Sequence, residues 1–330
     1  ARRRQSHGLH IFLTVILVIL TACVVVKAFF LKAPEQKAAE LPAQPASSDT
    51  DSQQSPEEQA AQEALRSHLE RKGGFYTILL SGLDDDNGGS DTNILVAVDT
   101  VNGYVYGVSI PRDSKAIIDG KARKINYAYN KGGTELLADT VSEQLGIPVD
   151  YTVSVNLKGF TALVDAIGGV DFDVPINMDY DDPIQNLSIH FKKGVQHLSG
   201  ADALRVVRFR HNNDGSGYGS EDLGRMATQQ KFLKAVAKKM LSAGNILTKI
   251  DDYAKIFNQY VDTNLTVGNL AWLGTEVLKM GVDKIDFSTL PNAWKYPYIY
   301  LDPDETLALV NTYLNPYVED RTGEDLNLPG

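Results

Sequence analysis

Apolar residues recur along the chain from Phe75 onward in two patterns, namely short runs and longer segments with helical spacing. Asn102-Gly103, between two of the short runs, is typical of a hairpin turn because both residues tolerate positive φ angles. The short runs predict β-strands at residues 75–81, 92–99, 104–110, 151–155, 170–174 and 284–290.

The longer segments place apolar residues three or four positions apart, as on one face of a helix. Asn156 is a suitable N-cap for one of them, and Gly146 with Pro148 ends another. They predict helices at residues 133–145, 157–167, 222–243, 246–259, 267–280 and 304–313. Strands interleaved with helices predict an α/β fold, with one central β-sheet that is mixed because of the hairpin and is flanked by helices.

The N-terminal region has a different pattern, an apolar stretch from Leu9 to Val26 that residues up to Leu31 extend. Eighteen helical residues nearly span a bilayer core of about 30 Å, so residues 9–31 are predicted to form a transmembrane anchor. Arg2, Arg3 and Arg4 precede it, and the positive-inside rule places residues 1–8 in the cytoplasm. The expected location is therefore the cell membrane, with a single span and an extracellular domain.

There are two alternatives to an uncleaved anchor. A cleaved signal peptide has a shorter apolar run that ends in small residues, whereas Phe29 and Phe30 continue this run. Residues 20–23 resemble a lipoprotein box with Cys23 as the lipidated residue, but apolar rather than polar residues follow Cys23. The sequence therefore favours the anchor.

Residues 32–72 are rich in Ala, Gln, Glu, Ser and Pro, a composition that does not bury a core. They are predicted to form a spacer outside the membrane. The domain is expected at residues 73–330, with its informative motifs at about 75–242 and a helical C-terminal part at 243–330.

Composition narrows the classes of function. The formal net charge of −10 argues against general affinity for nucleic acid, which requires clustered Lys and Arg. Cys23 is the single cysteine, so neither an intrachain disulfide nor a cysteine-based zinc site is available. An anionic ligand must therefore meet a local basic site.

Arginines provide the candidate anion site. Arg208 and Arg210 are two residues apart, and an extended backbone would place both guanidinium groups on one face, where they suit a phosphate or diphosphate. Arg225 lies near the start of a predicted helix, where free amides also favour an anion. Arg112 directly follows a predicted strand. The alternative for each arginine is a surface ion pair, and His211 alone suits a structural hydrogen bond.

Two aspartates flank predicted strands. Asp84 follows the first strand and Asp91 precedes the second, so their carboxylates can converge on a hard cation such as Mg²⁺, which prefers oxygen ligands. The alternative is an ordinary turn, because residues 84–89 read Asp-Asp-Asp-Asn-Gly-Gly.

Seven short motifs together resemble the LytR-CpsA-Psr (LCP) family of cell-wall glycopolymer ligases. Each motif is weakly specific by itself, but their common order is highly specific. They are ILLSGLD at 78–84, SDT at 90–92, VSIPRD at 108–113, KINYAY at 124–129, LVDAIGGVD at 163–171, VRFRH at 207–211 and DLGR at 222–225.

The resemblance implies a membrane-anchored extracytoplasmic transferase that moves teichoic acid or capsular polysaccharide from a polyprenyl diphosphate carrier to peptidoglycan. It implies that Asp84 and Asp91 bind Mg²⁺, and that the polyprenyl tail lies in an apolar channel between sheet and helices. The arginines implied to grip the diphosphate are Arg112, Arg208, Arg210 and Arg225.

The chain departs from the family pattern at two positions. Gly89 stands where the family usually has an arginine before the Ser-Asp-Thr triplet, and Thr228 stands where it often has a second arginine after the Gly-Arg pair. The loop at residues 212–221 is also longer than usual. These changes leave the preference for donor or acceptor open.

Several mechanisms are compatible with these residues. A peptidoglycan hydroxyl can attack the anomeric carbon or the phosphorus, and Asp91 or Asp222 is the candidate base; together with Arg112, these are the predicted catalytic residues. A pyrophosphatase would use the same metal and arginines with water as acceptor. A non-catalytic envelope sensor would only bind the lipid diphosphate.

Overall fold

The computed structural model describes residues 31–37, 68–83, 89–184, 187–219, 221–240 and 250–330. The predicted anchor up to residue 30, most of the predicted spacer and Asp84 lie outside these ranges. Within these ranges, no helix is long and apolar enough to cross a membrane.

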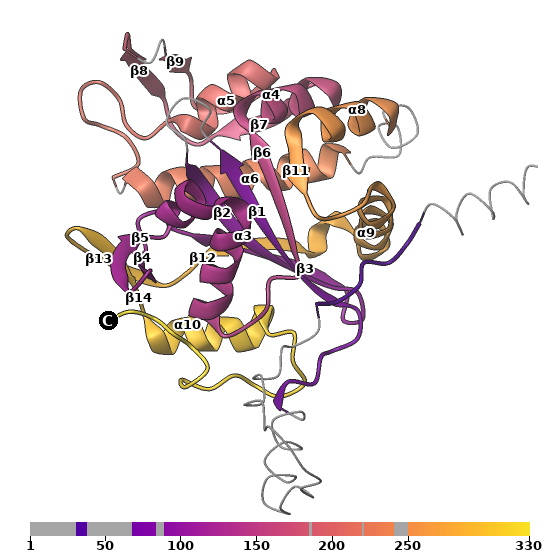
Figure 1. Ribbon diagram of the computed structural model, residues 1–330. Coiled ribbons are helices and arrows are strands. Elements are labelled where there is room, and N and C mark those ends of the chain that lie inside the picture. Colours follow the sequence, from indigo (N-terminus) through magenta and orange to yellow (C-terminus); the bar gives the residue numbers. More distant parts are fainter. Residues whose placement is uncertain (1–30, 38–67, 84–88, 185–186, 220, 241–249) are drawn as a thin grey trace, which may run out of the picture.

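The centre of the molecule is a six-stranded sheet with the strand order β11-β6-β1-β2-β3-β12 (Figure 1). β1 is parallel to β6 and β3 is parallel to β12, whereas the remaining neighbours are antiparallel. The predicted mixed central sheet is therefore confirmed. Its strands are β1 Phe75–Leu83, β2 Ser90–Asp99, β3 Tyr104–Ile110, β6 Tyr151–Asn156, β11 Val261–Thr263 and β12 Ile285–Thr289.

Helices cover both faces of this sheet because its central strands are apolar on both sides. Leu79 and Leu95 pack in one core with α3, whereas Ile78 and Ile94 pack in a second core with Leu273 of α9. A third core joins α4, α5 and α6 beyond the end of the sheet. The helices are α3 Asn126–Leu145, α4 Leu157–Ala166, α5 Gly200–Arg208, α6 Glu221–Met240, α8 Ile250–Tyr260, α9 Val267–Met280 and α10 Pro303–Leu309.

Four two-stranded sheets surround the central layers, and only one of their strands, β7, was predicted. Most are short and rich in charged or aromatic residues, so they lack the apolar runs that mark a buried strand. They are β4 Lys115–Ile118 with β5 Lys121–Lys124, β7 Val170–Val174 with β10 Gly194–Leu198, β8 Met178–Asp182 with β9 Leu187–Phe191, and β13 Asn292–Lys295 with β14 Tyr298–Leu301.

Local signals were informative at one predicted turn and at one predicted helix cap. Gly103 has a φ of 74° and its N–H donates to the Asp99 carbonyl at 2.9 Å, which closes the β2–β3 hairpin. Asn156 caps α4, since its Oδ1 accepts from Gly159 N at 2.8 Å. Both expectations are confirmed.

The expected extended backbone through Arg208 was wrong, because Arg208 is the last residue of α5. Ser199 caps this helix by accepting from Asp202 N, and Ala203 and Val206 bury its inner face. The backbone becomes extended only at Phe209, with φ −61° and ψ 135°. A capped amphipathic turn thus outweighed the local Arg-Phe-Arg pattern.

A short segment near the N-terminus is bound to the domain. Gln36 Nε2 donates to the carbonyls of Lys72 and Phe75, each at 2.7 Å. The N–H of Lys37 donates to Asp150 Oδ1 at 2.9 Å. Residues 32–37, part of the predicted spacer, are thereby held at the edge of the sheet opposite the site described next.

Candidate functional site

A cavity of about 660 Å³ opens at the edge of the sheet where the parallel strands β1 and β6 both end. One wall is made by side chains on the face of the sheet that α6 and α9 cover. The other walls are made by α4, α5 and α6. The apolar lining residues are Leu80, Leu83, Ile94, Val153, Val155, Leu157, Phe160, Leu163, Leu187, Leu204, Val207, Phe232 and Leu233. Such a lining suits a hydrocarbon chain.

All four predicted arginines line this cavity, although they come from three separate parts of the chain. Arg112 follows β3, Arg208 ends α5, Arg210 lies two residues later and Arg225 is near the start of α6. The structure therefore brings together the residues that the sequence nominated. Four guanidinium groups around one opening form a local positive site in a chain with a net charge of −10.

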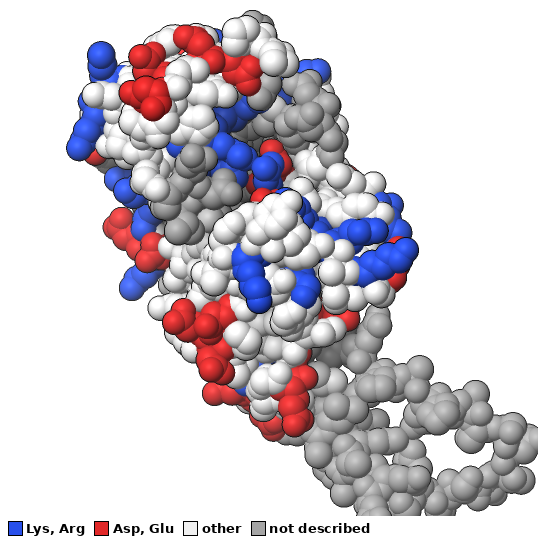
Figure 2. Space-filling view, turned by 90° about the vertical axis from the view of Figure 1, so that its left-hand side faces the viewer, with Lys and Arg blue, Asp and Glu red and all other residues white. Residues whose placement is uncertain are grey.

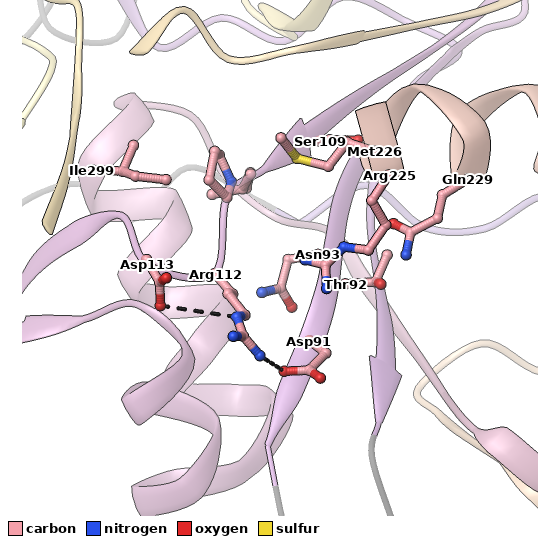
Figure 3. Close-up of a pocket in the computed structure, with 12 residues that line it drawn as sticks. Asp91, Thr92, Asn93, Ser109, Arg112, Asp113, Arg225, Met226, Gln229 and Ile299 are labelled. Carbon is pink, nitrogen blue, oxygen red and sulfur yellow. Dashed lines mark hydrogen bonds and ion pairs between the residues drawn. The ribbon is translucent and has the colours of Figure 1, made fainter. Parts of the chain in front are cut away.

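Arg112 and Asp91 are in direct contact at the rim of the cavity (Figure 3). Arg112 Nη1 lies 2.7 Å from Asp91 Oδ1, and Arg112 Nε lies 3.9 Å from Asp113 Oδ1. Asp113 also contacts Lys124 Nζ at 3.1 Å. Arg112 is therefore oriented by carboxylates on two sides.

The backbone around Arg112 is fixed by a tight turn. Ser114 N donates to the Pro111 carbonyl at 3.0 Å, and Asn126 N donates to the Arg112 carbonyl at 3.2 Å. Ile125 N also donates to the Ser114 carbonyl at 2.8 Å. The residues after β3 and the start of α3 are thus joined by backbone hydrogen bonds, which fix the position of Arg112.

Arg225 is largely buried, with an exposed fraction of 8%, and extends from α6 toward Thr92 and Asn93 (Figure 3). The residue before it must be small, since a Cβ on Gly224 would lie 2.2 Å from the Tyr218 side chain. Glycine there lets the loop after Arg210 pack directly against the helix.

Thr228 occupies the position where the family often has arginine, and it has a structural use. Its Oγ1 lies 2.9 Å from the Tyr218 hydroxyl and 3.0 Å from the Gly224 carbonyl, and the residue is 2% exposed. Burial raises the pKa of the Tyr218 phenol, an effect that its hydrogen bond with Thr228 opposes. Thr228 thus fastens the loop to α6 rather than presenting a charge to the cavity.

Two glutamines on α6 were missed by the sequence reasoning. Gln229 lines the cavity and donates to the Val207 carbonyl at 3.1 Å. Gln230 Nε2 donates to Ser109 Oγ at 2.9 Å and to the Ser288 carbonyl at 2.7 Å. These bonds join α6 to α5 and to two strand ends, and the only signal in the sequence was their place one turn after Arg225.

His211 has the structural contacts that its isolated position suggested. Its Nδ1 is 2.9 Å from the Asn212 carbonyl, and its ring packs edge-on against Tyr180 at 5.5 Å. Both residues line the cavity beside Arg210. They connect the β8–β9 hairpin to the arginine cluster.

The predicted metal and base residues are described only in part. Asp91 is the acidic residue among the described side chains that line the large cavity, while Asp84 and the Asp222 side chain lie outside the described ones. The described residues contain no cluster of three His, Cys, Asp or Glu suited to a metal. A single carboxylate beside arginines still fits Mg²⁺, which commonly combines one or two carboxylates with substrate phosphates.

Comparison with proteins of known sequence places this geometry in context. The sequence is 37% identical over 202 residues to a polyisoprenyl-teichoic acid–peptidoglycan teichoic acid transferase, TagV of Bacillus subtilis, covering 58% of this chain and 50% of that protein. It is 36% identical over 195 residues to TagU of Bacillus cereus, which has the same transferase name, covering 58% and 60%. The alignments therefore span about half of each relative's length.

Solved structures share the fold. The B. subtilis TagV structure aligns with a TM-score of 0.61 and 32% identity, over 73% of this chain and 96% of that one. A protein from Enterococcus faecalis titled as a transcriptional regulator aligns with a TM-score of 0.62 and 26% identity, over 76% and 91%. The mixed sheet with flanking helices is thus the fold of these proteins.

The match to a family extends over most of the chain. Residues 41–314 fit the LytR_cpsA_psr family, a range that includes all seven motifs and every residue described above as lining the cavity. The chain therefore belongs to the LytR-CpsA-Psr family.

Proposed function

We propose that this protein is a membrane-anchored extracytoplasmic transferase that attaches an anionic glycopolymer to peptidoglycan from a polyprenyl diphosphate carrier. The polymer is a teichoic acid or a capsular polysaccharide. The observation that carries the proposal is the cluster of four arginines at the opening of an apolar cavity of about 660 Å³. The transferase names of TagV and TagU support the same chemistry.

The arginines suit the diphosphate because each guanidinium keeps its charge and offers paired donors to phosphate oxygens. Arg208 and Arg210 approach from the end of α5, whereas Arg112 and Arg225 approach from the sheet edge and α6. A diphosphate between them would be contacted from two sides. This arrangement favours the charge that develops on the leaving diphosphate during transfer.

The cavity behind the arginines suits the lipid. Its apolar lining includes Val153 and Val155 on β6, Phe160 and Leu163 on α4, and Phe232 on α6. Burying hydrocarbon there contributes about 25 cal/mol for each Å² removed from water. The lipid would thereby hold the diphosphate in register with the arginines.

Mg²⁺ is part of the proposal, with Asp91 and Asp84 as its protein ligands. When bound, it would neutralise phosphate oxygens and favour departure of the diphosphate. Arg112 lies 2.7 Å from Asp91, so it orients this carboxylate whether or not the cation is bound.

In the proposed reaction, a peptidoglycan hydroxyl forms a new bond to the donor while the bond to the leaving phosphate breaks. Attack at the anomeric carbon would release polyprenyl diphosphate, whereas attack at phosphorus would transfer a phosphosugar and release polyprenyl phosphate. Asp91 or Asp222 would accept the hydroxyl proton. Arg112, the third proposed catalytic residue, would stabilise the leaving oxygens.

The test is product analysis with the purified ectodomain, Mg²⁺, a lipid-linked donor and peptidoglycan. Covalent polymer on the glycan is expected, and its formation should fall strongly in Arg112→Ala and Arg208→Ala. Polyprenyl phosphate without polymer transfer would indicate a pyrophosphatase instead. Binding without any product would indicate a sensor.

Attachment to the membrane is proposed from the apolar residues 9–31 and the arginines before them. A donor anchored by its polyprenyl chain explains why such a transferase would stay beside the bilayer. Protease treatment of intact cells should degrade the domain and leave a membrane-bound N-terminal fragment. A domain recovered in the culture medium would contradict the anchor.

A further inference from the structure

Two small hairpins, β4–β5 and β13–β14, lie side by side (Figure 1). Tyr298 Oη donates to the Ala122 carbonyl at 3.2 Å, which joins the hairpins. Ile299 N donates to the Asp113 carbonyl at 2.9 Å, and Asp113 directly follows Arg112. We call the exposed surface of residues 115–124 and 292–301 the hairpin surface.

The hairpin surface is basic. It carries one acidic residue, Asp119, which pairs with Lys131 of α3. Figure 2 shows Lys and Arg around the hollow of this face and on the surface below it, with most Asp and Glu at the top and bottom and a few beside the hollow. The basic residues of the two hairpins are Lys115, Lys121, Arg123, Lys124 and Lys295.

Aromatic residues accompany these charges. Lys115 Nζ lies 4.9 Å and Lys295 Nζ 5.7 Å from the centre of the Tyr300 ring, so both cations contact the same aromatic ring. Trp294 and Tyr296 have exposed fractions of 58% and 86%. Both lie in the β13–β14 hairpin, and aromatic side chains are enriched at surfaces where proteins bind partners.

The hairpin surface is continuous with the diphosphate site. Trp294 pairs with Ile299 across the hairpin, so both are on the same face, and Ile299 lines a hollow of about 20 Å³ together with Arg112. Asp113 contacts both Arg112 and Lys124. A ligand that extends from the arginines in this direction would next meet Trp294 and Lys124.

The chemistry of the hairpin surface matches a chain that alternates phosphates with sugars or polyols. Lysine and arginine attract phosphate groups, while the flat face of an indole or phenol packs against the C–H groups of a sugar ring. A neutral glycan would not use the charges, and a plain polyphosphate would not use the exposed rings. An anionic glycopolymer uses both features.

We propose that the hairpin surface binds the sugar-phosphate chain of the donor polymer beyond the diphosphate, an inference that rests on the proposed function. The arginine cluster holds the invariant diphosphate end of every donor. The hairpin surface instead contacts the repeating units of the polymer, so it determines which polymers bind well. Affinity for the polymer should therefore increase with the number of phosphates until the surface is covered.

Direct binding tests this proposal without a lipid or turnover. Soluble poly(glycerol phosphate) oligomers are titrated into the ectodomain and into the charge reversal Lys121→Glu/Arg123→Glu and the truncation Trp294→Ala. Loss of phosphate contacts should weaken binding by about tenfold in the first variant and reduce its salt dependence. The matched control, Lys192→Glu/Lys193→Glu, makes the same charge change on exposed residues between β9 and β10 and should bind like the parent.

The parent should bind poly(glycerol phosphate) more tightly than neutral dextran or soluble peptidoglycan fragments. The hairpin variants should lose this preference. Equal polymer binding by the parent and all variants would overturn the proposal, and so would a selective loss of peptidoglycan-fragment binding, which would assign the surface to the acceptor. All variants should have the same melting temperature as the parent, because the substituted side chains are exposed.

A second measurement separates this proposal from the proposed function. Transfer is compared for a donor that carries a single disaccharide and for one that carries a long polymer. The hairpin variants should transfer the short donor at the parental rate and the long donor more slowly. If the parent transfers neither donor but the variants still lose polymer binding, the proposed function fails and the hairpin surface stands.

Discussion

Arg112 and Asp91, which the sequence suggested for a diphosphate and a metal respectively, are ion-paired with 2.7 Å between Nη1 and Oδ1. Their side chains are 27% and 40% exposed, and pairs with such exposure typically contribute about 0–1 kcal/mol to folding. The pair therefore does little for stability. At the rim of the cavity, the pair instead serves to orient both side chains toward a ligand.

Asp91→Asn should consequently separate activity from stability. The amide keeps the shape of the side chain but loses the charge that orients Arg112 and attracts Mg²⁺. Polymer transfer should fall by about 100-fold, a loss of nearly 3 kcal/mol in transition-state stabilisation, and the Mg²⁺ concentration for half-maximal rate should rise. The melting temperature should change by about 3 °C at most.

The control for this substitution is Asp171→Asn, which removes a carboxylate from another exposed ion pair, 2.7 Å from His197 Nδ1. It should retain both transfer and stability. Parental transfer by Asp91→Asn, or an equal loss in both variants, would show that Asp91 has no special place in the reaction.

Arg208 and Arg205 provide a matched pair of arginines on one helix. Arg208 lines the cavity, whereas Arg205 is one turn earlier and contacts Asp202 at 2.8 Å on the surface. Arg208→Gln should lower transfer at least about tenfold, because a charge-assisted bond to phosphate contributes about 1.5–3 kcal/mol. Arg205→Gln should leave the rate unchanged. Similar rates for the two variants would remove Arg208 from the diphosphate site.

Much of the fold was predictable because its central strands are buried on both faces. In β1 and β2, residues such as Ile78, Leu79 and Leu95 form apolar runs that no surface element shares. The β4–β5 and β13–β14 hairpins have no such run, since Lys and Tyr occupy many of their positions. Their conformation depends on contacts with Asp113 and with each other rather than on local pattern.

The site was predictable as a set of residues but not as an arrangement. The motifs nominated four arginines that the structure gathers around one cavity. The contact between Asp91 and Arg112 follows from the register of two antiparallel strands, in which Asn93 pairs with Ile110, and no single motif contains it. Likewise, Thr228 could be read as a missing arginine until its contact with Tyr218 was visible.

Leu204 on α5 allows the apolar cavity to be tested by filling it. Leu204→Trp adds a ring to the lining and should raise KM for a donor with a long polyprenyl chain several-fold. Donors with a short isoprenoid should be affected less, because they occupy less of the cavity. Leu278→Trp places the same ring on an exposed position of α9 and should change neither KM. Equal effects on long and short donors would argue against a lipid-binding cavity.

His190 should make the β8–β9 hairpin sensitive to pH. Its hydrogen bond to Asp179, at 2.7 Å, raises the imidazole pKa above 6.5, and Asp181 contributes in the same direction. Because the pKa of His190 is raised in the folded state, charged His190 stabilises the hairpin fully below pH 6.5. This stabilisation is lost as pH rises through the folded pKa. Tyr180 and Leu187 of this hairpin line the cavity.

Hydrogen exchange measures this effect. After correction for the intrinsic rate, the β8–β9 amides should lose protection as pH rises above about 6.5, the unperturbed value for histidine. His190→Gln should show low protection at every pH. Protection that is independent of pH in the parent would contradict a charged His190 in the folded hairpin.

Asp150 is the position where one substitution should cost the most stability. Its side chain has no exposed surface, and its carboxylate accepts from Arg71 at 2.8 and 3.1 Å, from the Thr77 N–H at 2.9 Å and from the Lys37 N–H at 2.9 Å. Asp150→Asn leaves the Arg71 guanidinium buried without its counter-charge and replaces one acceptor oxygen by a donor. Breaking a buried pair in this way costs about 3–5 kcal/mol.

For a domain of this size, that cost corresponds to a fall in melting temperature of about 6–20 °C, which calorimetry of the ectodomain resolves. Asp286→Asn is the matched control, since Asp286 is 75% exposed and lies 3.7 Å from Lys234, and it should shift the midpoint by less than about 3 °C. Because Asp150 also holds Lys37, removal of residues 32–37 should destabilise the parent more than it destabilises Asp150→Asn. Additive losses would show that this N-terminal segment is held independently of the buried pair.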